Sequence, residues 1–148
     1  MPDILHRVGV NAPLQPVYRM LSRPEGVSRW WTRKVTGTAE LGGTLELRFK
    51  NDSLIMHMRV EELRPLSLIR WRVLAGPPEW IGTAISFELK SNGDESVVLF
   101  KHAGWKEPVE FMHHCSTKWG YYMLSLKSLL EEGRGTPHPD ERPASSWG

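Results

Sequence analysis

A histidine on the apolar face of a predicted strand is the residue with the most chemical potential in this chain. His102 shares a face with Val98 and Phe100, opposite Lys101, so its imidazole is expected to point inward. A buried neutral imidazole can orient a polar ligand group or act as a general base. The favoured alternative is a histidine that is hydrogen-bonded to backbone or to a neighbouring indole.

A second group, His113, His114 and Cys115, invites comparison with a zinc site. Consecutive residues of a helix diverge around its axis, and neither the CxxC nor the HxxxH spacing is present, so we predict no metal and no cofactor here. Cys115 lies on the apolar helix face, where a thiol is usually an inert small hydrophobe. The sequence also lacks a GxSxG elbow, a Gly-rich phosphate loop and an inward pair of carboxylates. It therefore favours a protein that is not an enzyme.

The aromatic residues point to a cavity instead. Six of the seven tryptophans fall on predicted elements that could converge on one concave space; Trp147 lies in an irregular tail. Of the adjacent Trp30 and Trp31, at most one is expected to face the core squarely. Core packing and pocket walls have the same composition, so both interpretations stay open for this set. The predicted ligand-binding residues are Trp31, Met56, Met58, Trp71, Trp80, Phe87, Phe100, His102, Phe111, Cys115, Trp119 and Tyr122.

The periods of the apolar residues predict the elements that must position these side chains. A period of two predicts strands over residues 3–11, 44–50, 54–61, 66–74, 81–90 and 95–103. Two short helices follow the first strand, and the second of them is predicted to run through Trp30 and Trp31. From Phe111 to Leu129 apolar residues recur every three or four positions, which indicates a long amphipathic helix that Gly133 ends.

This order predicts an α+β helix-grip fold. A curved antiparallel sheet of about six to seven strands wraps around the long C-terminal helix, and the two short helices close one end. We expect residues 1–135 to form one domain and residues 136–148 a flexible tail or one draped over the surface. The space between sheet and helix becomes a cavity wherever side chains do not fill it.

Composition excludes several classes of protein. The formal net charge is only +2, too small for a nucleic-acid binder. No apolar run approaches the roughly 20 residues that span a bilayer. The N-terminus has no apolar signal region, and a lone cysteine suits a reducing compartment, so we expect a cytoplasmic protein.

Several local motifs reinforce this fold. They are Ala12-Pro13 with Val17-Tyr18, Pro24-Glu25-Gly26 with Trp30-Trp31, Trp71, Trp80-Ile81-Gly82-Thr83, His102-Ala103-Gly104-Trp105, Cys115-Ser116-Thr117-Lys118-Trp119 and Leu124-Ser125-Leu126-Lys127. With the order of elements, they resemble the START-like (SRPBCC) superfamily, in its branch related to the C-terminal domain of the heat-shock-protein ATPase activator. The resemblance covers residues 3–135. It implies a helix-grip fold with a hydrophobic cavity, in a family whose members range from co-chaperone domains to lipid carriers and cyclases.

Three functions follow as hypotheses. The favoured one is binding of a hydrophobic or aromatic small molecule, or a lipid, between sheet and helix. The resemblance implies a second, a co-chaperone-like interaction domain of the stress response with a chaperone partner. The third is a small cyclase or hydrolase with His102 as base. Because Val97 and Leu99 lie opposite the inward face, a second copy in a homodimer, or the tail, could cover that surface.

Overall fold

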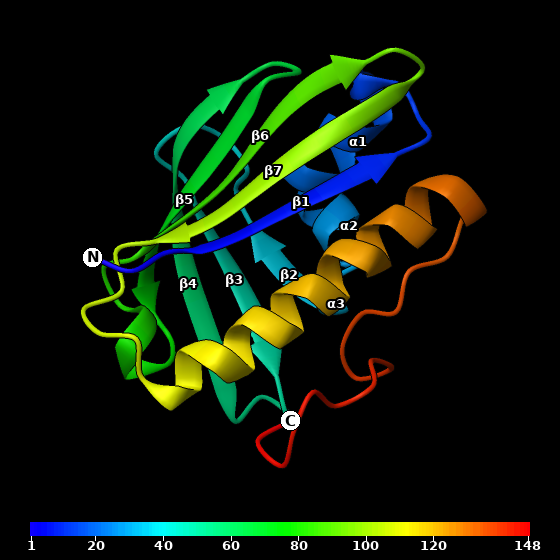
Figure 1. Cartoon of the computed structure of the whole chain (residues 1–148). Helices are drawn as coiled ribbons and strands as arrows, with labels where there is room; N and C mark the ends of the chain where they lie inside the picture. The colour runs from blue at the N-terminus through cyan, green and yellow to red at the C-terminus, as the bar shows by residue number, and fades with distance from the viewer.

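Seven antiparallel strands form one curved sheet that wraps around a long C-terminal helix (Figure 1). The computed structural model describes all 148 residues. The strands are β1 (Ile4–Val10), β2 (Lys34–Gly37), β3 (Thr44–Phe49), β4 (Leu54–Arg64), β5 (Leu68–Ala75), β6 (Ala84–Asn92) and β7 (Glu95–Ala103). Their spatial order is β1-β7-β6-β5-β4-β3-β2. The predicted α+β helix-grip fold is confirmed.

Alternation along the strands places one face of the sheet in the core. In β3, Leu45, Leu47 and Phe49 are buried, while the residues between them are partly exposed. Charged side chains cover the opposite, convex face and pair across strands; Arg72 Nη2, for example, donates to Glu61 Oε1 at 3.0 Å. Exposed pairs of this kind contribute little to stability, so burial of the concave face is what holds the sheet.

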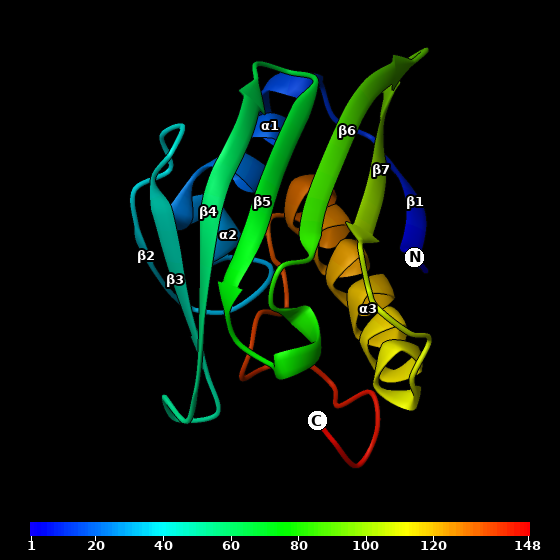
Figure 2. The same ribbon diagram turned by 90° about the vertical axis from the view of Figure 1, so that its left-hand side faces the viewer.

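The long helix α3 (Glu110–Glu132) lies across the concave face of the sheet (Figure 2). Its buried stripe consists of Cys115, Trp119, Tyr122, Met123, Ser125, Leu126 and Leu129. The helix ends at Gly133, as predicted, with φ at 84° and its N–H bonded to the Leu129 carbonyl. None of the helices combines the length and apolar character needed to cross a membrane.

The two short helices, α1 (Leu14–Ser22) and α2 (Pro24–Val27), pack against the concave side near one end of the sheet. The prediction that the second helix includes both tryptophans is wrong, because α2 ends at Val27 and a turn carries Trp30 and Trp31. Outside helical geometry the two indoles need not diverge, and both face the core, with exposed fractions of 0% and 2%. Trp30 donates to the Met20 carbonyl at 2.9 Å, and Trp31 stacks on Trp71 with ring centroids 6.1 Å apart.

Several strand boundaries also differ from the predicted ones. β5 begins at Leu68 rather than at residue 66, because Arg64–Ser67 forms a turn in which Leu66 has φ of 63°. β4 runs on to Arg64. β6 begins at Ala84, after a 3-10 helix, η1 (Pro78–Trp80), which occupies the predicted loop.

Residues 134–148 turn back from the end of α3 and run beneath the sheet–helix layer (Figures 1 and 2). The His138 N–H donates to the Trp31 carbonyl at 2.8 Å, and Thr32 and His138 form an isolated parallel bridge. The Thr136 N–H donates to Ser125 Oγ on α3 at 2.8 Å. The first part of the tail is therefore bonded to both α3 and the turn that follows α2.

Candidate functional site

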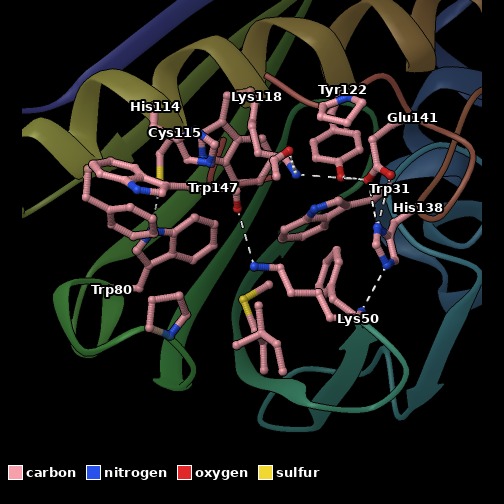
Figure 3. Close-up of a pocket in the computed structure, with 18 of the residues that line it drawn as sticks. Trp31, Lys50, Trp80, His114, Cys115, Lys118, Tyr122, His138, Glu141 and Trp147 are labelled. Carbon is pink, nitrogen blue, oxygen red and sulfur yellow. Dashed lines mark hydrogen bonds and ion pairs between the residues drawn. The ribbon is translucent and has the colours of Figure 1, made fainter. Parts of the chain in front are cut away.

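The interior is open where the β3–β4 hairpin, η1, the first half of α3 and the tail meet (Figure 3). The cavity there has a volume of about 380 Å³. Small-molecule sites in proteins occupy about 300–1,000 Å³, so this cavity is large enough for a ligand. It is lined by Trp31, Phe49, Lys50, Leu54, Met56, Pro77, Trp80, Phe111, His114, Cys115, Lys118, Trp119, Tyr122, His138, Pro139, Glu141, Pro143, Trp147 and Gly148.

Three indoles form the inner wall of the cavity. Trp119, from α3, lies between the other two. Its ring centroid is 4.8 Å from that of Trp31 and 5.9 Å from that of Trp80, on which it stacks. All three side chains are buried, with exposed fractions between 2% and 8%. The wall is therefore an apolar surface of the kind against which flat aromatic or aliphatic groups pack.

Two lysines bring positive charge to the cavity. Lys118 Nζ donates to a main-chain oxygen of Gly148 at 2.9 Å and lies 4.0 Å from a carboxylate oxygen of Glu141. Lys50 Nζ, from the β3–β4 hairpin, donates to the Trp147 carbonyl at 3.4 Å. Burial lowers the pKa of Lys118, and the nearby Lys50 lowers it further, while Glu141 opposes both. The two ammonium groups thus meet main-chain oxygen atoms of the last two residues of the tail.

The carboxylate of Glu141 is already engaged within the protein. The Tyr122 hydroxyl donates to it at 2.5 Å, and His138 Nδ1 lies 2.9 Å from the same oxygen. The backbone N–H of Lys50 donates to His138 Nε2 at 2.9 Å, so Nδ1 carries the ring proton and donates to Glu141. Burial, with the hydrogen bond and charge of Glu141, raises the pKa of Tyr122 well above its ordinary value.

The thiol of Cys115 also borders the cavity. Its Sγ accepts a hydrogen bond from Trp80 Nε1 at 3.4 Å, and burial raises its pKa to about 12. It is therefore protonated at neutral pH and unsuited to act as a nucleophile. His114 faces the tail, with Nδ1 2.6 Å from Ser145 Oγ, whereas His113 is exposed. No group of three or more His, Cys, Asp or Glu side chains is arranged to hold a metal ion.

His102 lies behind the cavity wall and is fully buried. Trp119 Nε1 donates to its Nδ1 at 3.2 Å, so the ring proton is on Nε2, which donates to Thr83 Oγ1 at 2.8 Å. The Thr83 hydroxyl in turn donates to the Trp80 carbonyl at 2.5 Å. Burial lowers the pKa of His102 to about 3. Because both ring nitrogens are occupied, the geometry supports the packing role rather than that of a general base.

The predicted ligand-binding residues fall into two groups in the structure. Those that line the cavity are Trp31, Met56, Trp80, Phe111, Cys115, Trp119 and Tyr122. Those that are buried without lining it are Met58, Trp71, Phe87, Phe100 and His102. Three of them, Trp71, Phe87 and Phe100, pack ring against ring, with 5.2 Å between the centroids of Trp71 and Phe87 and 5.5 Å between those of Phe87 and Phe100.

The site also contains residues of the tail and of the turn between β3 and β4 that the sequence pattern does not predict to lie there. Lys50, His138, Glu141 and Trp147 all border the cavity (Figure 3). Of these four residues, only Trp147 has a feature in the sequence that indicates a buried contact, because an indole in an otherwise polar segment usually packs against other side chains. Its ring centroid lies 6.2 Å from that of Phe111, and 46% of the residue is exposed.

Comparison with solved structures gives the same architecture. The Aha1 dimer of Colwellia psychrerythraea, a solution structure, is 37% identical over 91% of this chain and 100% of that chain, with a TM-score of 0.82. A protein from Staphylococcus saprophyticus is 21% identical over 90% of this chain and 95% of its own, with a TM-score of 0.76. CalU16 from Micromonospora echinospora is 16% identical over 95% of this chain and 77% of its own, with a TM-score of 0.73. These last two show the shared fold alone.

Comparison with protein families is more specific. No curated protein matches the sequence. The family model for "Activator of Hsp90 ATPase homolog 1-like protein" matches residues 11–131, from the start of α1 to the last turn of α3. The match confirms the resemblance to the ATPase-activator branch of the SRPBCC proteins. Since the family model spans most of the chain, including six of the seven strands and the helix α3, this protein belongs to the Activator of Hsp90 ATPase homolog 1-like family.

Proposed function

We propose that the protein binds a hydrophobic or aromatic small molecule, or the apolar part of a lipid, in the cavity beneath α3. The observation that carries the proposal is a space of about 380 Å³ with an indole wall, beside a core cluster of 30 buried residues. Apolar surface buried there would drive binding, at about 25 cal/mol for each Å². The Tyr122 hydroxyl and the two lysines would orient polar groups of the ligand.

A neutral aromatic probe tests this proposal directly. N-phenyl-1-naphthylamine emits strongly in apolar surroundings, and we expect saturable emission at a single site. Cys115→Phe fills the cavity from α3 and is expected to weaken binding by about tenfold or more. Thr117→Phe, on the exposed side of the same helix, is the matched control and should bind as the wild type does.

Circular dichroism establishes that both phenylalanine variants remain folded before their affinities are compared. Absence of saturable binding by the wild type would contradict the proposal. So would equal affinity of the two folded variants, because it would place the probe outside the cavity.

A second candidate is a protein-interaction role of the co-chaperone type, favoured by the family match. It would use the charged convex face and the helix ends rather than the cavity. We expect a bacterial Hsp90 to hydrolyse ATP faster at saturating protein, and the Cys115→Phe variant to stimulate as well as the wild type. Unchanged turnover would dispose of this role.

We propose two further properties of this protein. The Colwellia structure is a dimer, and we propose a homodimer for this chain, to be tested by light scattering on a sizing column. We also propose a cytoplasmic location, which the free, buried thiol of Cys115 supports.

A further inference from the structure

The tail, residues 134–148, forms the outer wall of the cavity (Figure 3). Its lining residues are His138, Pro139, Glu141, Pro143, Trp147 and Gly148. The family model matches residues 11–131, so this wall is built from a part of the chain outside the matched range. A ligand in the cavity therefore meets a surface that the family comparison does not describe.

The first part of the tail is fastened to both sides of the cavity. The N–H of Thr136 donates to Ser125 Oγ of α3 at 2.8 Å. The N–H of His138 donates to the Trp31 carbonyl, in the turn after α2, also at 2.8 Å. The tail thus bridges the long helix and the turn that carries one of the three wall indoles.

The last part of the tail is fastened to α3 as well. The Arg142 N–H donates to the Tyr121 hydroxyl at 3.2 Å, and Ser145 Oγ lies 2.6 Å from Nδ1 of His114. The ring centroid of Trp147 is 5.6 Å from that of His114. Because these contacts recur along the tail, the outer wall is a fixed part of the site.

Trp147 lies between the cavity and the solvent. It lines the cavity, yet 46% of the residue is exposed. Its ring centroid is 6.2 Å from that of Phe111, another lining residue. A side chain that borders both cavity and solvent closes the cavity at that point. A ligand cannot extend past Trp147 while the tail stays in place.

The charged side chains of the lining already have partners within the protein. Lys118 Nζ donates to a main-chain oxygen of Gly148 at 2.9 Å, and Lys50 Nζ to one of Trp147 at 3.4 Å. The carboxylate of Glu141 accepts hydrogen bonds from two other lining residues. A charged ligand group would have to displace one of these partners, whereas an uncharged ligand leaves them all in place.

We propose that the tail is a fixed wall that limits the size of the ligand, and that Trp147 sets this limit. The ligand is then a compact, uncharged apolar molecule rather than a long-chain lipid. The inference rests on the proposed function, since it assigns a ligand class to the same cavity. It adds a specificity-determining residue that lies outside the range matched by the family model.

A series of primary alcohols from 1-hexanol to 1-hexadecanol measures the limit, by competition with N-phenyl-1-naphthylamine. Each added methylene group that is buried should tighten binding about fourfold. We expect the affinity of the wild type to rise with chain length and then to fall, once the chain reaches Trp147. Trp147→Ala should move the maximum to a longer alcohol, which this variant binds about tenfold more tightly than the wild type does.

Leu124→Ala, at an exposed position of α3 away from the cavity, is the matched control and should keep the wild-type maximum. Circular dichroism establishes that both alanine variants are folded. An unchanged maximum in Trp147→Ala would overturn the inference and leave the proposed function standing. So would an affinity of the wild type that keeps rising to 1-hexadecanol, because the tail would then give way. Failure of N-phenyl-1-naphthylamine to saturate the wild type would instead overturn the proposed function.

Decanoate, which is ionised at neutral pH, tests whether the ligand is uncharged. We expect it to bind the wild type about tenfold more weakly than 1-decanol does, because burial of a charge without a free partner is unfavourable. Equal or tighter binding of decanoate would mean that a lysine of the lining is available to an anion, which contradicts the uncharged class.

Discussion

The indole N–H of Trp119 donates a hydrogen bond to Nδ1 of His102 at 3.2 Å, and this bond joins α3 to β7 in the buried interior. Trp119 also lies between the rings of Trp31 and Trp80, so the bond helps to fix the inner wall of the cavity. A buried polar pair of this kind specifies one register of helix on sheet, because any other would leave both groups without partners. The histidine acts on the site through its support of Trp119.

Replacement of His102 by leucine is expected to lower the free energy of unfolding by about 2–3 kcal/mol, since the indole N–H of Trp119 and the hydroxyl of Thr83 both lose a buried partner. Urea denaturation measures the loss. His113→Leu, at an exposed position of α3, is the control and should change stability by about 0.5 kcal/mol or less. Similar losses in the two variants would contradict the structural role of the buried ring.

Stability should also fall as the pH drops below about 6.5. The pKa of His102 is lowered from 6.5 to about 3 by burial, so the unfolded chain takes up the proton first. The neutral ring makes its full contribution to the free energy of unfolding above pH 6.5, and this contribution is lost as the pH falls toward 3. One proton changes stability by at most about 1.4 kcal/mol per pH unit.

Urea denaturation at about pH 7.5 and about pH 5.5 tests this slope above the range in which carboxylates titrate. The wild type should lose more stability between the two values than His102→Leu does. Parallel losses would mean that other groups set the pH dependence.

The repeating apolar patterns are sufficient to predict the sheet and α3, because burial of one face is a local property of a strand or helix. They fail to predict the backbone at Trp30 and Trp31. There α2 ends after one turn, and the backbone conformation is set by the packing of the two buried indoles rather than by a repeating pattern. The tail has no period at all. Its position depends on the bond between His138 and the Trp31 carbonyl, which a one-dimensional pattern does not contain.

The cavity was predictable only in part, and two methionines of β4 show why. Met56 and Met58 lie on the same face of the strand and are both buried, but only Met56 borders the cavity. An inward direction follows from alternation, whereas the filling of the space in front of a side chain depends on neighbours from the rest of the chain. Lys50 and Glu141 escaped prediction because the turn and the tail that carry them have no periodic inward face.

Native Cys115 should react slowly with maleimides. Burial raises its pKa to about 12 from an ordinary value of 9, so the thiolate fraction near neutral pH is about a thousandfold lower. We expect labelling, followed by mass spectrometry, to be at least that much slower for the folded protein than for the protein in urea. Rapid labelling of the folded protein would show that the thiol is accessible and ionised, contrary to its bond with Trp80.

Two glycines of the long helix should respond to alanine in opposite directions. Gly133 has φ of 84°, a conformation that a β-carbon disfavours, so Gly133→Ala is expected to cost about 1 kcal/mol of stability. Gly120 lies within α3, and a β-carbon there would meet the His6 ring at 3.5 Å, an ordinary contact. Gly120→Ala should therefore stabilise the protein by up to about 1 kcal/mol, because alanine loses less backbone entropy on folding.

Chemical denaturation of both alanine variants measures the two effects under one set of conditions, and each variant serves as the control for the other. They carry the same substitution on the same chain segment, so differences in helix propensity alone would give changes of one sign. A loss at position 133 together with a gain at position 120 requires that α3 continue through Gly120 and end at Gly133. Changes of the same sign at both positions would contradict either the left-handed end of the helix or the free space beside His6.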